Sequence, residues 1–167
     1  MSSVWQYLTL GLGRETFGID IENVQEILDY RAPAALPQAP AFLVGMIDVR
    51  GQSYPVVDLR TKLGLPPEAP TQATRIILLN IPMPDQTMQD QPTKERTMRV
   101  GFVADRVFEV TELDRAEMEA APEVGGRWRS TYIAGIGRRG DAFVVVFDLV
   151  RLMAGDEPAL AGRPLAA

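Results

Sequence analysis

A strand–turn–strand unit that occurs twice in the chain limits the possible folds more than any other feature. In residues 42–59, two short apolar runs flank the segment Arg50-Gly51-Gln52-Ser53, and such runs around turn residues are typical of a β-hairpin. Residues 132–149 repeat the same order of an aromatic residue, a glycine, an Arg-Gly turn, a second apolar run and Asp-Leu. The chain therefore contains this unit twice, which predicts a fold with two related halves.

The repeat keeps its register within two blocks of sequence. A shift of 90 positions relates Phe42 to Tyr132, Gly45 to Gly135, Asp58 to Asp148, Leu59 to Leu149 and Leu63 to Met153. Upstream, a shift of 83 positions relates Gly18 to Gly101, Val24 to Val107, Glu26 to Glu109 and Ile27 to Val110. Each half has about 50 residues, too few to form a comfortable core alone. We therefore expect an all-β fold of two small closed barrels within one domain, residues 1–155. The expected subdomains span about residues 14–70 and 74–155, and the N-terminal strand is shared.

Apolar alternation and turn residues place the other elements. Strands are expected over residues 4–12, 16–21, 75–81 and 99–103, in addition to the two hairpins. Residues 23–28 fit either a helix or a strand, and the interpretation that we favour is a turn followed by a strand. Short helical turns are expected at residues 40–43, 58–64, 115–121 and 149–154, with Asp caps for the second and fourth and a capping box for the third. Residues 82–98 are predicted to form a long solvated hairpin loop, and residues 156–167 a flexible tail.

The composition excludes several kinds of site. The chain has no Cys and no His, so it has no disulfide, thiolate metal site, cysteine nucleophile or phosphohistidine, and it lacks the usual general base. Its 22 Asp and Glu against 17 Lys and Arg give a net charge of −5, which disfavours nucleic acid and anionic lipid as main partners. No apolar run approaches the roughly 20 residues that span a bilayer, and the N-terminus does not resemble a signal peptide. We expect a cytoplasmic protein that binds other proteins.

Two motifs that could suggest chemistry have simpler structural explanations. Residues 135–140 match G-x-G-x-x-G, but a strand follows them where a dinucleotide site needs a helix, so a hairpin turn explains the glycines. Asp58 and Asp148 could be a carboxylate pair, but each precedes a short amphipathic turn, so helix capping explains both. We predict no catalytic, cofactor or metal site.

A charged pair is the candidate site that the hairpin does not explain. A turn requires Gly51 but gives no reason for Arg50, whose other interpretation is a solvated turn residue. Glu26 lies in an otherwise apolar run and recurs as Glu109, either on a strand face turned to water or beside an apolar surface that a partner covers. Pairing between Glu26 and Arg50 is compatible with both interpretations.

Ordered motifs in both halves resemble those of one known family. The matching segments are Phe17-Gly18-Ile19-Asp20-Ile21, Val24-Gln25-Glu26-Ile27, Leu36-Pro37, Ala39-Pro40, Gly45-Met46-Ile47, Arg50-Gly51, Pro55-Val56-Val57-Asp58-Leu59-Arg60, Gly101-Phe102-Val103-Ala104-Asp105-Arg106-Val107, Glu109-Val110, Pro122 and Tyr132-Ile133-Ala134-Gly135. Over residues 5–154 the chain resembles the chemotaxis coupling (adaptor) proteins, the CheW-like domain family. The resemblance implies two intertwined five-stranded SH3-like barrels. It also implies a non-catalytic adaptor that joins the regulatory domain of a histidine kinase to the cytoplasmic tip of transmembrane chemoreceptors in signalling arrays.

The resemblance further implies positions that bind these partners. Receptor contact would fall in a groove between the barrels, and Gly45, Arg50 and Gly51 match positions associated with coupling. The implied partner-binding residues are Val24, Glu26, Ile27, Gly45, Arg50, Gly51, Val100, Phe102 and Val103. The chain departs from the family in having Asp48 where Asn is common, a longer connection at residues 82–98 and an extension past the last helix.

A small β-barrel module that binds nucleic acid or a ligand is the alternative, and an enzyme ranks third. The alternative requires a basic face that carries aromatic residues, whereas the arginines of this acidic chain are scattered along the sequence.

Overall fold

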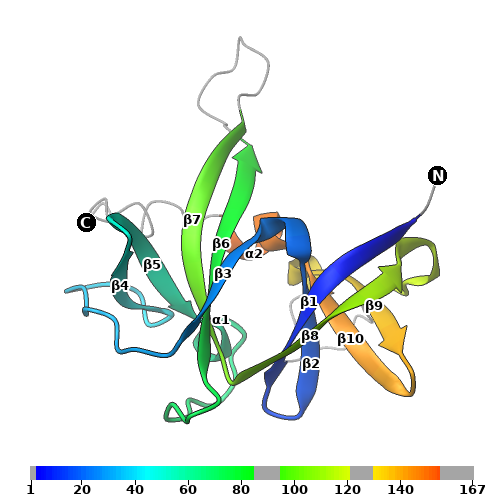
Figure 1. Cartoon of the computed structure of the whole chain (residues 1–167), viewed down its shortest axis with the longest axis horizontal. Helices are drawn as coiled ribbons and strands as arrows, with labels where there is room; N and C mark the ends of the chain where they lie inside the picture. Colours follow the sequence, from blue (N-terminus) through cyan, green and yellow to red (C-terminus); the bar gives the residue numbers. More distant parts are fainter. Residues whose placement is uncertain (1–2, 85–94, 121–129, 155–167) are drawn as a thin grey trace.

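Two curled five-stranded sheets form the core of the computed structural model, which describes residues 3–84, 95–120 and 130–154 (Figure 1). The sheet that we call the first barrel has the strand order β8-β1-β2-β10-β9, and the second barrel has the order β3-β6-β7-β5-β4. The strands are β1 (Val4–Leu12), β2 (Glu15–Asp20), β3 (Val24–Asp29), β4 (Leu43–Val49), β5 (Gln52–Asp58), β6 (Arg75–Pro84), β7 (Glu95–Ala104), β8 (Arg106–Asp114), β9 (Ile133–Arg139) and β10 (Ala142–Phe147). The helices are short: α1 (Leu59–Lys62), α2 (Leu149–Met153) and the 3₁₀ turns η1 (Ile21–Asn23), η2 (Arg115–Glu117) and η3 (Ser130–Tyr132). The all-β, two-barrel prediction is confirmed, and within the described residues no helix has the length and apolarity to cross a membrane.

Each barrel combines strands from both copies of the repeat. The β1–β2 hairpin of the first copy pairs in parallel with β10 of the second, and the β6–β7 hairpin of the second copy pairs in parallel with β5 of the first. The two junctions are equivalent, because Gly18 lies opposite Val146 in one and Gly101 lies opposite Val56 in the other. The sheets therefore do not divide the chain at residues 70–74 as the expected subdomains do. The strands of the first barrel lie within residues 4–20, 106–114 and 133–147, and those of the second within residues 24–29, 43–58, 75–84 and 95–104.

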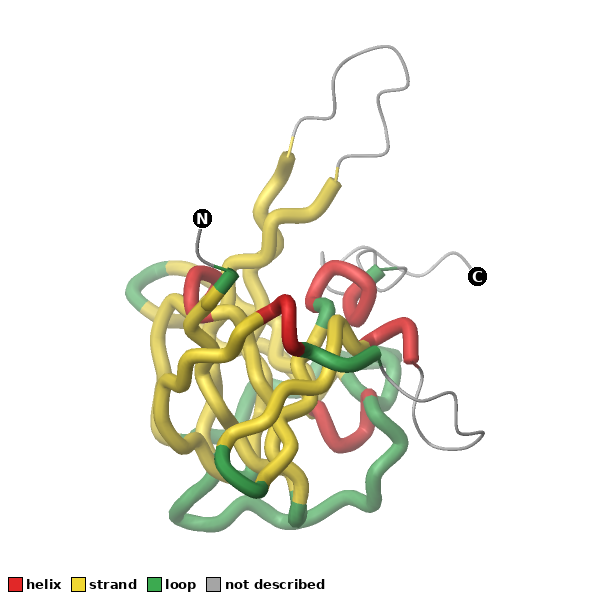
Figure 2. The backbone as a smooth tube through the Cα atoms, turned by 90° about the vertical axis from the view of Figure 1, so that its right-hand side faces the viewer, coloured by secondary structure: helices red, strands yellow, loops and turns green. Residues whose placement is uncertain are grey.

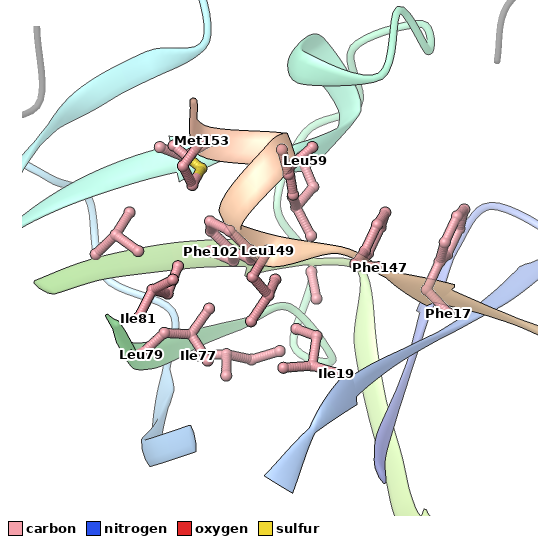
Figure 3. Close-up of a cluster of buried hydrophobic side chains, with 14 of the residues drawn as sticks. Phe17, Ile19, Leu59, Ile77, Leu79, Ile81, Phe102, Phe147, Leu149 and Met153 are labelled. Atoms are coloured by element: carbon pink, nitrogen blue, oxygen red, sulfur yellow. The ribbon is translucent and has the colours of Figure 1, made fainter. Parts of the chain in front are cut away.

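The largest core lies between the barrels. The rings of Phe17 and Phe147, from β2 and β10, stack with their centroids 5.0 Å apart, and Leu59 and Leu149 at the starts of α1 and α2 are equivalent residues in the same cluster (Figure 3). Strand β1 was expected to be half-buried, but it is buried on both faces from Tyr7 onward. One face of β1 fills the interior of the first barrel, and the other packs against the second.

The connection between β6 and β7 is more ordered than predicted. The two strands pair as far as Pro84 and Glu95, so the expected loop is wrong for residues 82–84 and 95–98, and residues 85–94 lie outside the described residues. Ile81 and Met83 are buried on either side of the exposed Pro82, which is the alternation of a strand. Prolines are tolerated here because β3 pairs with β6 only as far as Leu79, which leaves one edge open. Figures 1 and 2 show this ribbon projecting from the barrels.

One of the four predicted helical turns is largely replaced by other structure. Of the described residues 115–120, only Arg115–Glu117 form a turn, η2, because Met118 is extended and Glu119 exchanges backbone hydrogen bonds of 3.0 and 2.8 Å with Ile136. Residues 40–43 do form a single turn, in which the Leu43 N–H donates to the Pro40 carbonyl, and β4 begins at Leu43. Tertiary pairing thus overrode the local signal at Met118 and Glu119.

The two predicted Asp caps are confirmed, whereas the predicted capping box is not formed, because Thr111 lies within β8 and Asp114 itself caps η2. The carboxylate of Asp58 accepts a hydrogen bond from the Arg60 N–H, and that of Asp148 accepts one from the Arg151 N–H. Gly140 turns the β9–β10 hairpin with φ +61°, which agrees with reading the G-x-G-x-x-G motif as a turn.

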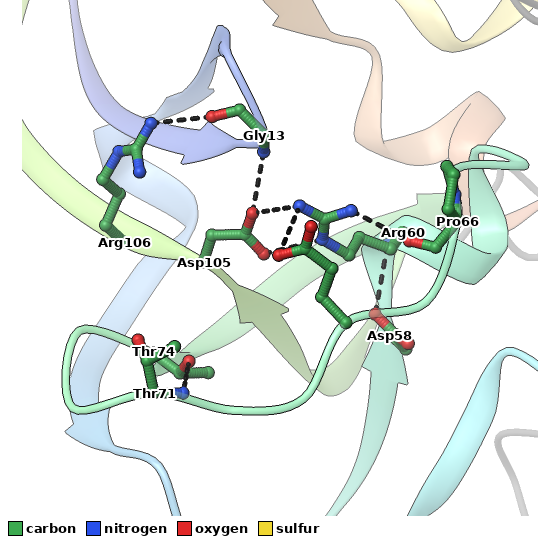
Figure 4. A network of polar contacts seen from close by, with 9 residues as sticks. Gly13, Asp58, Arg60, Pro66, Thr71, Thr74, Asp105 and Arg106 are labelled. Carbon is green, nitrogen blue, oxygen red and sulfur yellow. Dashed lines mark hydrogen bonds and ion pairs between the residues drawn. The ribbon is translucent and has the colours of Figure 1, made fainter.

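A polar clamp connects the barrels where the chain passes from β7 to β8 (Figure 4). Asp105 accepts hydrogen bonds from Arg60 Nε at 2.9 Å and from the Gly13 N–H at 2.7 Å, so it ties α1 to the β1–β2 turn. The Arg60 side chain is 9% exposed and also donates to the Pro66 carbonyl at 2.8 Å. The Arg60 guanidinium and the Gly13 N–H hold the pKa of Asp105 below its usual range, against the opposing effect of burial.

We expect the clamp to weaken in acid. Because the pKa of Asp105 is lowered on folding, its contribution to stability is present above the unfolded value of about 3.9 and is lost as the pH falls through the folded value. Urea unfolding of the parent and of Asp105→Asn between pH 7 and pH 2 measures this contribution. The difference in unfolding free energy should be greatest near neutrality and shrink below about pH 4. A difference that does not change with pH would contradict this role.

Candidate functional site

An exposed ion pair joins the two edge strands of the second barrel. Arg50, in the β4–β5 turn, donates from Nη2 to Oε2 of Glu26 on β3 over 2.7 Å. The arginine side chain is 71% exposed and the glutamate 29%. The hydrogen bond that Arg50 donates to Glu26, together with the charge of that carboxylate, raises the pKa of Arg50. The structure thus forms the pairing that the sequence analysis found compatible with both interpretations of Glu26.

The turn itself does not favour arginine. Arg50 and Gly51 form a two-residue loop between the paired Val49 and Gln52, with φ of +49° and +80°, which is the pattern of a type I′ turn. A residue with a side chain costs about 1 kcal/mol in the left-handed conformation, which Gly or Asn adopts more readily. The turn conformation therefore does not explain an arginine at position 50, so the explanation must lie in the contacts that its side chain makes.

Both polar and apolar residues surround the ion pair. A shallow depression of about 310 Å³ is lined by Glu26, Leu28, Asp29, Arg31, Asp48, Val49 and Arg50. Within it, Arg31 donates to the Asp48 carbonyl, and Ser53 donates to the Asp48 carboxylate at 2.7 Å. Ile27 is 41% exposed and follows Glu26 on β3. We call Glu26, Arg50 and Gly51 the candidate face. Ile27 lies outside it, because neighbouring residues of a strand point to opposite faces, and Ile27 is paired with Ile77 whereas Glu26 is paired with Leu78. The chemistry of the candidate face suits docking, and no cluster of metal-binding side chains occurs in the described residues.

The other residues implied by the family resemblance lie behind this face. Val100 and Phe102 have no exposed surface, and Gly45 is buried, so none of the three can make side-chain contact with a partner. This corrects their assignment as contact residues: β7 is a central strand whose side chains fill the interior. Val24 and Val103 are half-buried and pack against the cores.

Sequence reasoning did not identify the matching pair of the first barrel. Glu109 on β8 forms an ion pair with Arg139 at the end of β9, and this pair joins the two edge strands of that barrel as Glu26 and Arg50 do in the other. The repeated glutamate and the second Arg-Gly were available signals. The turns differ by one residue, however, because the second hairpin turns at Gly140-Asp141 and leaves Arg139 in the strand.

Comparison with known proteins gives consistent matches along the chain. The family described as CheW-like domain matches residues 6–157. The chemotaxis protein CheW of Klebsiella aerogenes is 30% identical over 155 residues, which cover 93% of this chain and 85% of the relative. The protein of the same name from Treponema pallidum is 25% identical and covers 92% of this chain and 84% of the relative. The crystal structure of the scaffolding protein TtCheW from Thermoanaerobacter tengcongensis has the same fold, with a TM-score of 0.74, 24% identity and coverage of 89% of this chain and 87% of the other.

Proposed function

Because the chain belongs to the CheW-like domain family, we propose that it is a non-catalytic adaptor that couples a chemosensory histidine kinase to chemoreceptors. In this role it joins the regulatory domain of the kinase to the cytoplasmic tip of transmembrane receptors. It works in the cytoplasm and is recruited to receptor arrays at the membrane. The names of its relatives, chemotaxis protein CheW, support a scaffold in chemotaxis-type signalling.

The observation that carries the proposal is the candidate face. Glu26 and Arg50 present opposite charges on an exposed edge, and the apolar residues Leu28 and Val49 line the same depression. An exposed ion pair contributes only about 0–1 kcal/mol to folding, so the strained arginine has little value for stability. A partner that covers this depression would use both the charges of the pair and the apolar surface of Leu28 and Val49.

Direct binding tests the coupling role. We expect the protein to bind the regulatory domain of its cognate kinase with a Kd in the micromolar range, about 8 kcal/mol, as is typical of modest exchangeable interfaces. Isothermal titration calorimetry with the purified domain, and co-sedimentation with receptor cytoplasmic fragments, measure the two interactions. Absence of association with either partner at high micromolar concentration would refute the proposal.

Charge reversal on the candidate face separates docking from stability. Glu26→Arg and Arg50→Glu should each shift the midpoint of thermal unfolding by no more than a few degrees, because the pair is exposed. Each should weaken partner binding about tenfold or more, as expected when a docking charge is reversed.

The double variant Glu26→Arg/Arg50→Glu is the control. It restores the internal ion pair with inverted polarity, so it should regain the parent's stability without regaining partner binding. Full recovery of binding by the swap would mean that the pair acts only within the barrel.

A further inference from the structure

One position of the repeat carries an arginine in the first copy and a valine in the second. A shift of 90 positions relates Arg60, the cation of the polar clamp, to Val150 on α2. A shift of 83 positions relates Asp105, the carboxylate of the clamp, to Glu22. The second copy therefore has a carboxylate at the one position and an apolar residue in place of the cation at the other.

The backbone donor of the clamp is replaced as well. The clamp uses the N–H of Gly13, which follows Leu12, the last residue of β1. Ile81 is the equivalent of Leu12, because the residues that pair with these two, in β7 and β2, are related by the shift of 83 positions. Pro82 therefore takes the place of Gly13, and a proline has no N–H to donate. The clamp cannot form in the second copy.

An open cavity lies beside these replacements. It has a volume of about 500 Å³ and is lined by residues of β6 from the second barrel and by residues of β1, β10, η2 and α2. Its apolar lining includes Ile81, Pro82, Met118, Leu149 and Val150. Beside the equivalent residues of the first copy, the Arg60 side chain is only 9% exposed, so a guanidinium is buried there (Figure 4).

The charged side chains that line the cavity are mostly acidic. They are the three carboxylates of Asp20, Glu119 and Asp148 and one guanidinium, that of Arg115. Arg115 donates to Asp20 over 3.2 Å, which neutralises that carboxylate. Asp148 caps α2 and lies 3.6 Å from Nε of Arg151, an exposed residue outside the lining. Two of the four charges thus cancel within the cavity, and a third is partly balanced from outside it.

Glu119 is the carboxylate that remains. Its side chain is exposed and forms no ion pair within the part of the chain that the structure describes. It also lines a small depression that contains Arg138, but this arginine stacks on Phe143 instead, with Cζ 5.1 Å from the ring centroid. Glu22, likewise without an ion pair among the described residues, lies in an adjoining depression that shares Asp20 with the cavity. The cavity therefore offers negative charge beside an apolar wall.

We propose that this cavity receives an arginine side chain of a partner protein, whose neighbouring apolar residues cover Pro82 and Val150. The guanidinium binds Glu119 and Asp148 and takes the role that Arg60 has in the clamp. Arginine suits this place better than lysine, because its planar head is more weakly hydrated and its aliphatic stem packs on apolar surface. No residue of the candidate face lines the cavity, so the inference does not depend on the coupling role.

The test uses the full chain, labelled with ¹⁵N, and the peptide acetyl-Leu-Arg-Leu-amide. A titration followed by NMR should give saturable shifts at the backbone amides of Glu119, Ala134 and Val150, which line the cavity. The matched peptide has citrulline in place of arginine, which keeps the shape and removes the charge. It should bind at least tenfold more weakly, because its hydrogen bonds to the carboxylates are no longer assisted by charge.

Three variants locate the site. Val150→Arg installs the residue that the first copy carries, so the protein's own guanidinium should occupy the cavity and lower the affinity for the peptide at least tenfold. Glu119→Lys reverses the carboxylate that has no ion pair and should lower the affinity about tenfold. The control Glu117→Lys makes the same charge change two residues away, outside the lining, and should bind as the parent does. All three should keep the circular dichroism of the parent.

Several outcomes would overturn the proposal. Equal affinity for the arginine and citrulline peptides is one, and unchanged binding by both Val150→Arg and Glu119→Lys is another. Agmatine bound as tightly as the peptide would assign the cavity to a small guanidine instead of a protein. Tighter binding by Arg163→Ala would assign it to the C-terminal segment of the chain itself. None of these results affects binding of the kinase domain, which the variants of the candidate face test separately.

Discussion

Replacing Asp105 by alanine is expected to lower the free energy of unfolding by about 4 kcal/mol, since it leaves a buried charge without its partner. The Arg60 side chain is 9% exposed, and Asp105 accepts from its Nε at 2.9 Å. In the variant, Arg60 would retain the Pro66 carbonyl and the exposed Glu68, 3.5 Å away. The Gly13 N–H would also lose its acceptor, and the β1–β2 turn would then be held to this segment by Arg106, which donates to the Gly13 carbonyl, and by the Asp105 N–H, which donates to the Gly11 carbonyl.

Chemical denaturation at pH 7 measures this loss, and two controls make it specific. Asp29→Ala removes a carboxylate that is 94% exposed and lies 3.6 Å from Arg75, so it should cost less than about 0.5 kcal/mol. The paired change Arg60→Met/Asp105→Leu removes both charges and should cost less than Asp105→Ala alone, because no unpaired charge remains. If Asp105→Ala lowered the free energy of unfolding as little as Asp29→Ala does, the clamp would not contribute to the stability of the fold.

Gly45→Ala is expected to destabilise the protein by about 3 kcal/mol, because the added methyl group has no space. A Cβ at Gly45 would lie 2.2 Å from the carbonyl oxygen of Ala34, which is backbone and cannot rotate away. Ala34 and Met46 also exchange two backbone hydrogen bonds of 2.9 Å, which a shift of that segment would strain. The expected result is a lower midpoint of thermal unfolding and weaker partner binding that follows from the loss of folded protein.

The repeat supplies the matched control. Gly135 is the equivalent glycine, and a Cβ there would lie 3.1 Å from the sulfur of Met118, 3.2 Å from the Met118 Cβ and 3.4 Å from the Glu119 carbonyl oxygen, so every contact is longer than the 2.2 Å at Gly45. Gly135→Ala should therefore cost only about 1 kcal/mol. If Gly45→Ala kept the parent's stability but lost partner binding, Gly45 would act in docking as the family resemblance implied. Equal losses in the two variants would show that the Ala34 contact is not decisive.

Local signals predicted the short elements well wherever the neighbouring structure agreed with them. Asp58 and Asp148 cap α1 and α2, and residues 24–29 form a strand after a turn. The same signals failed at Met118 and Glu119, where the strand β9 offers Glu119 a partner at Ile136. A capping pattern contributes about 1 kcal/mol, which is too little to outweigh hydrogen bonds and packing from another strand.

The candidate face could be predicted from the sequence, but the burial of the residues behind it could not. Arg50 stood out because the turn gave no reason for it, and its pairing with Glu26 is the contact expected. The sequence could not show that Val100 and Phe102 are buried in the protein's own core. An apolar strand residue has the same local sequence pattern whether a partner protein or a second barrel of the same chain covers it. Burial is decided by what packs on the strand.

The sequence by itself determined that the protein is all-β, that it is built twice from one hairpin unit, and where glycines and caps bound that unit. Only the tertiary structure decided that the halves exchange hairpins, so that β2 joins β10 and β7 joins β5. The physical reason is the repeat itself. Gly18 and Gly101 are equivalent residues, as are Val56 and Val146, so a hairpin meets the same side chains in either copy. Strand pairing alone therefore cannot distinguish hairpins that pair within one copy from hairpins that pair across the two copies. The structure with exchanged hairpins also contains the core between the barrels and the Arg60–Asp105 clamp.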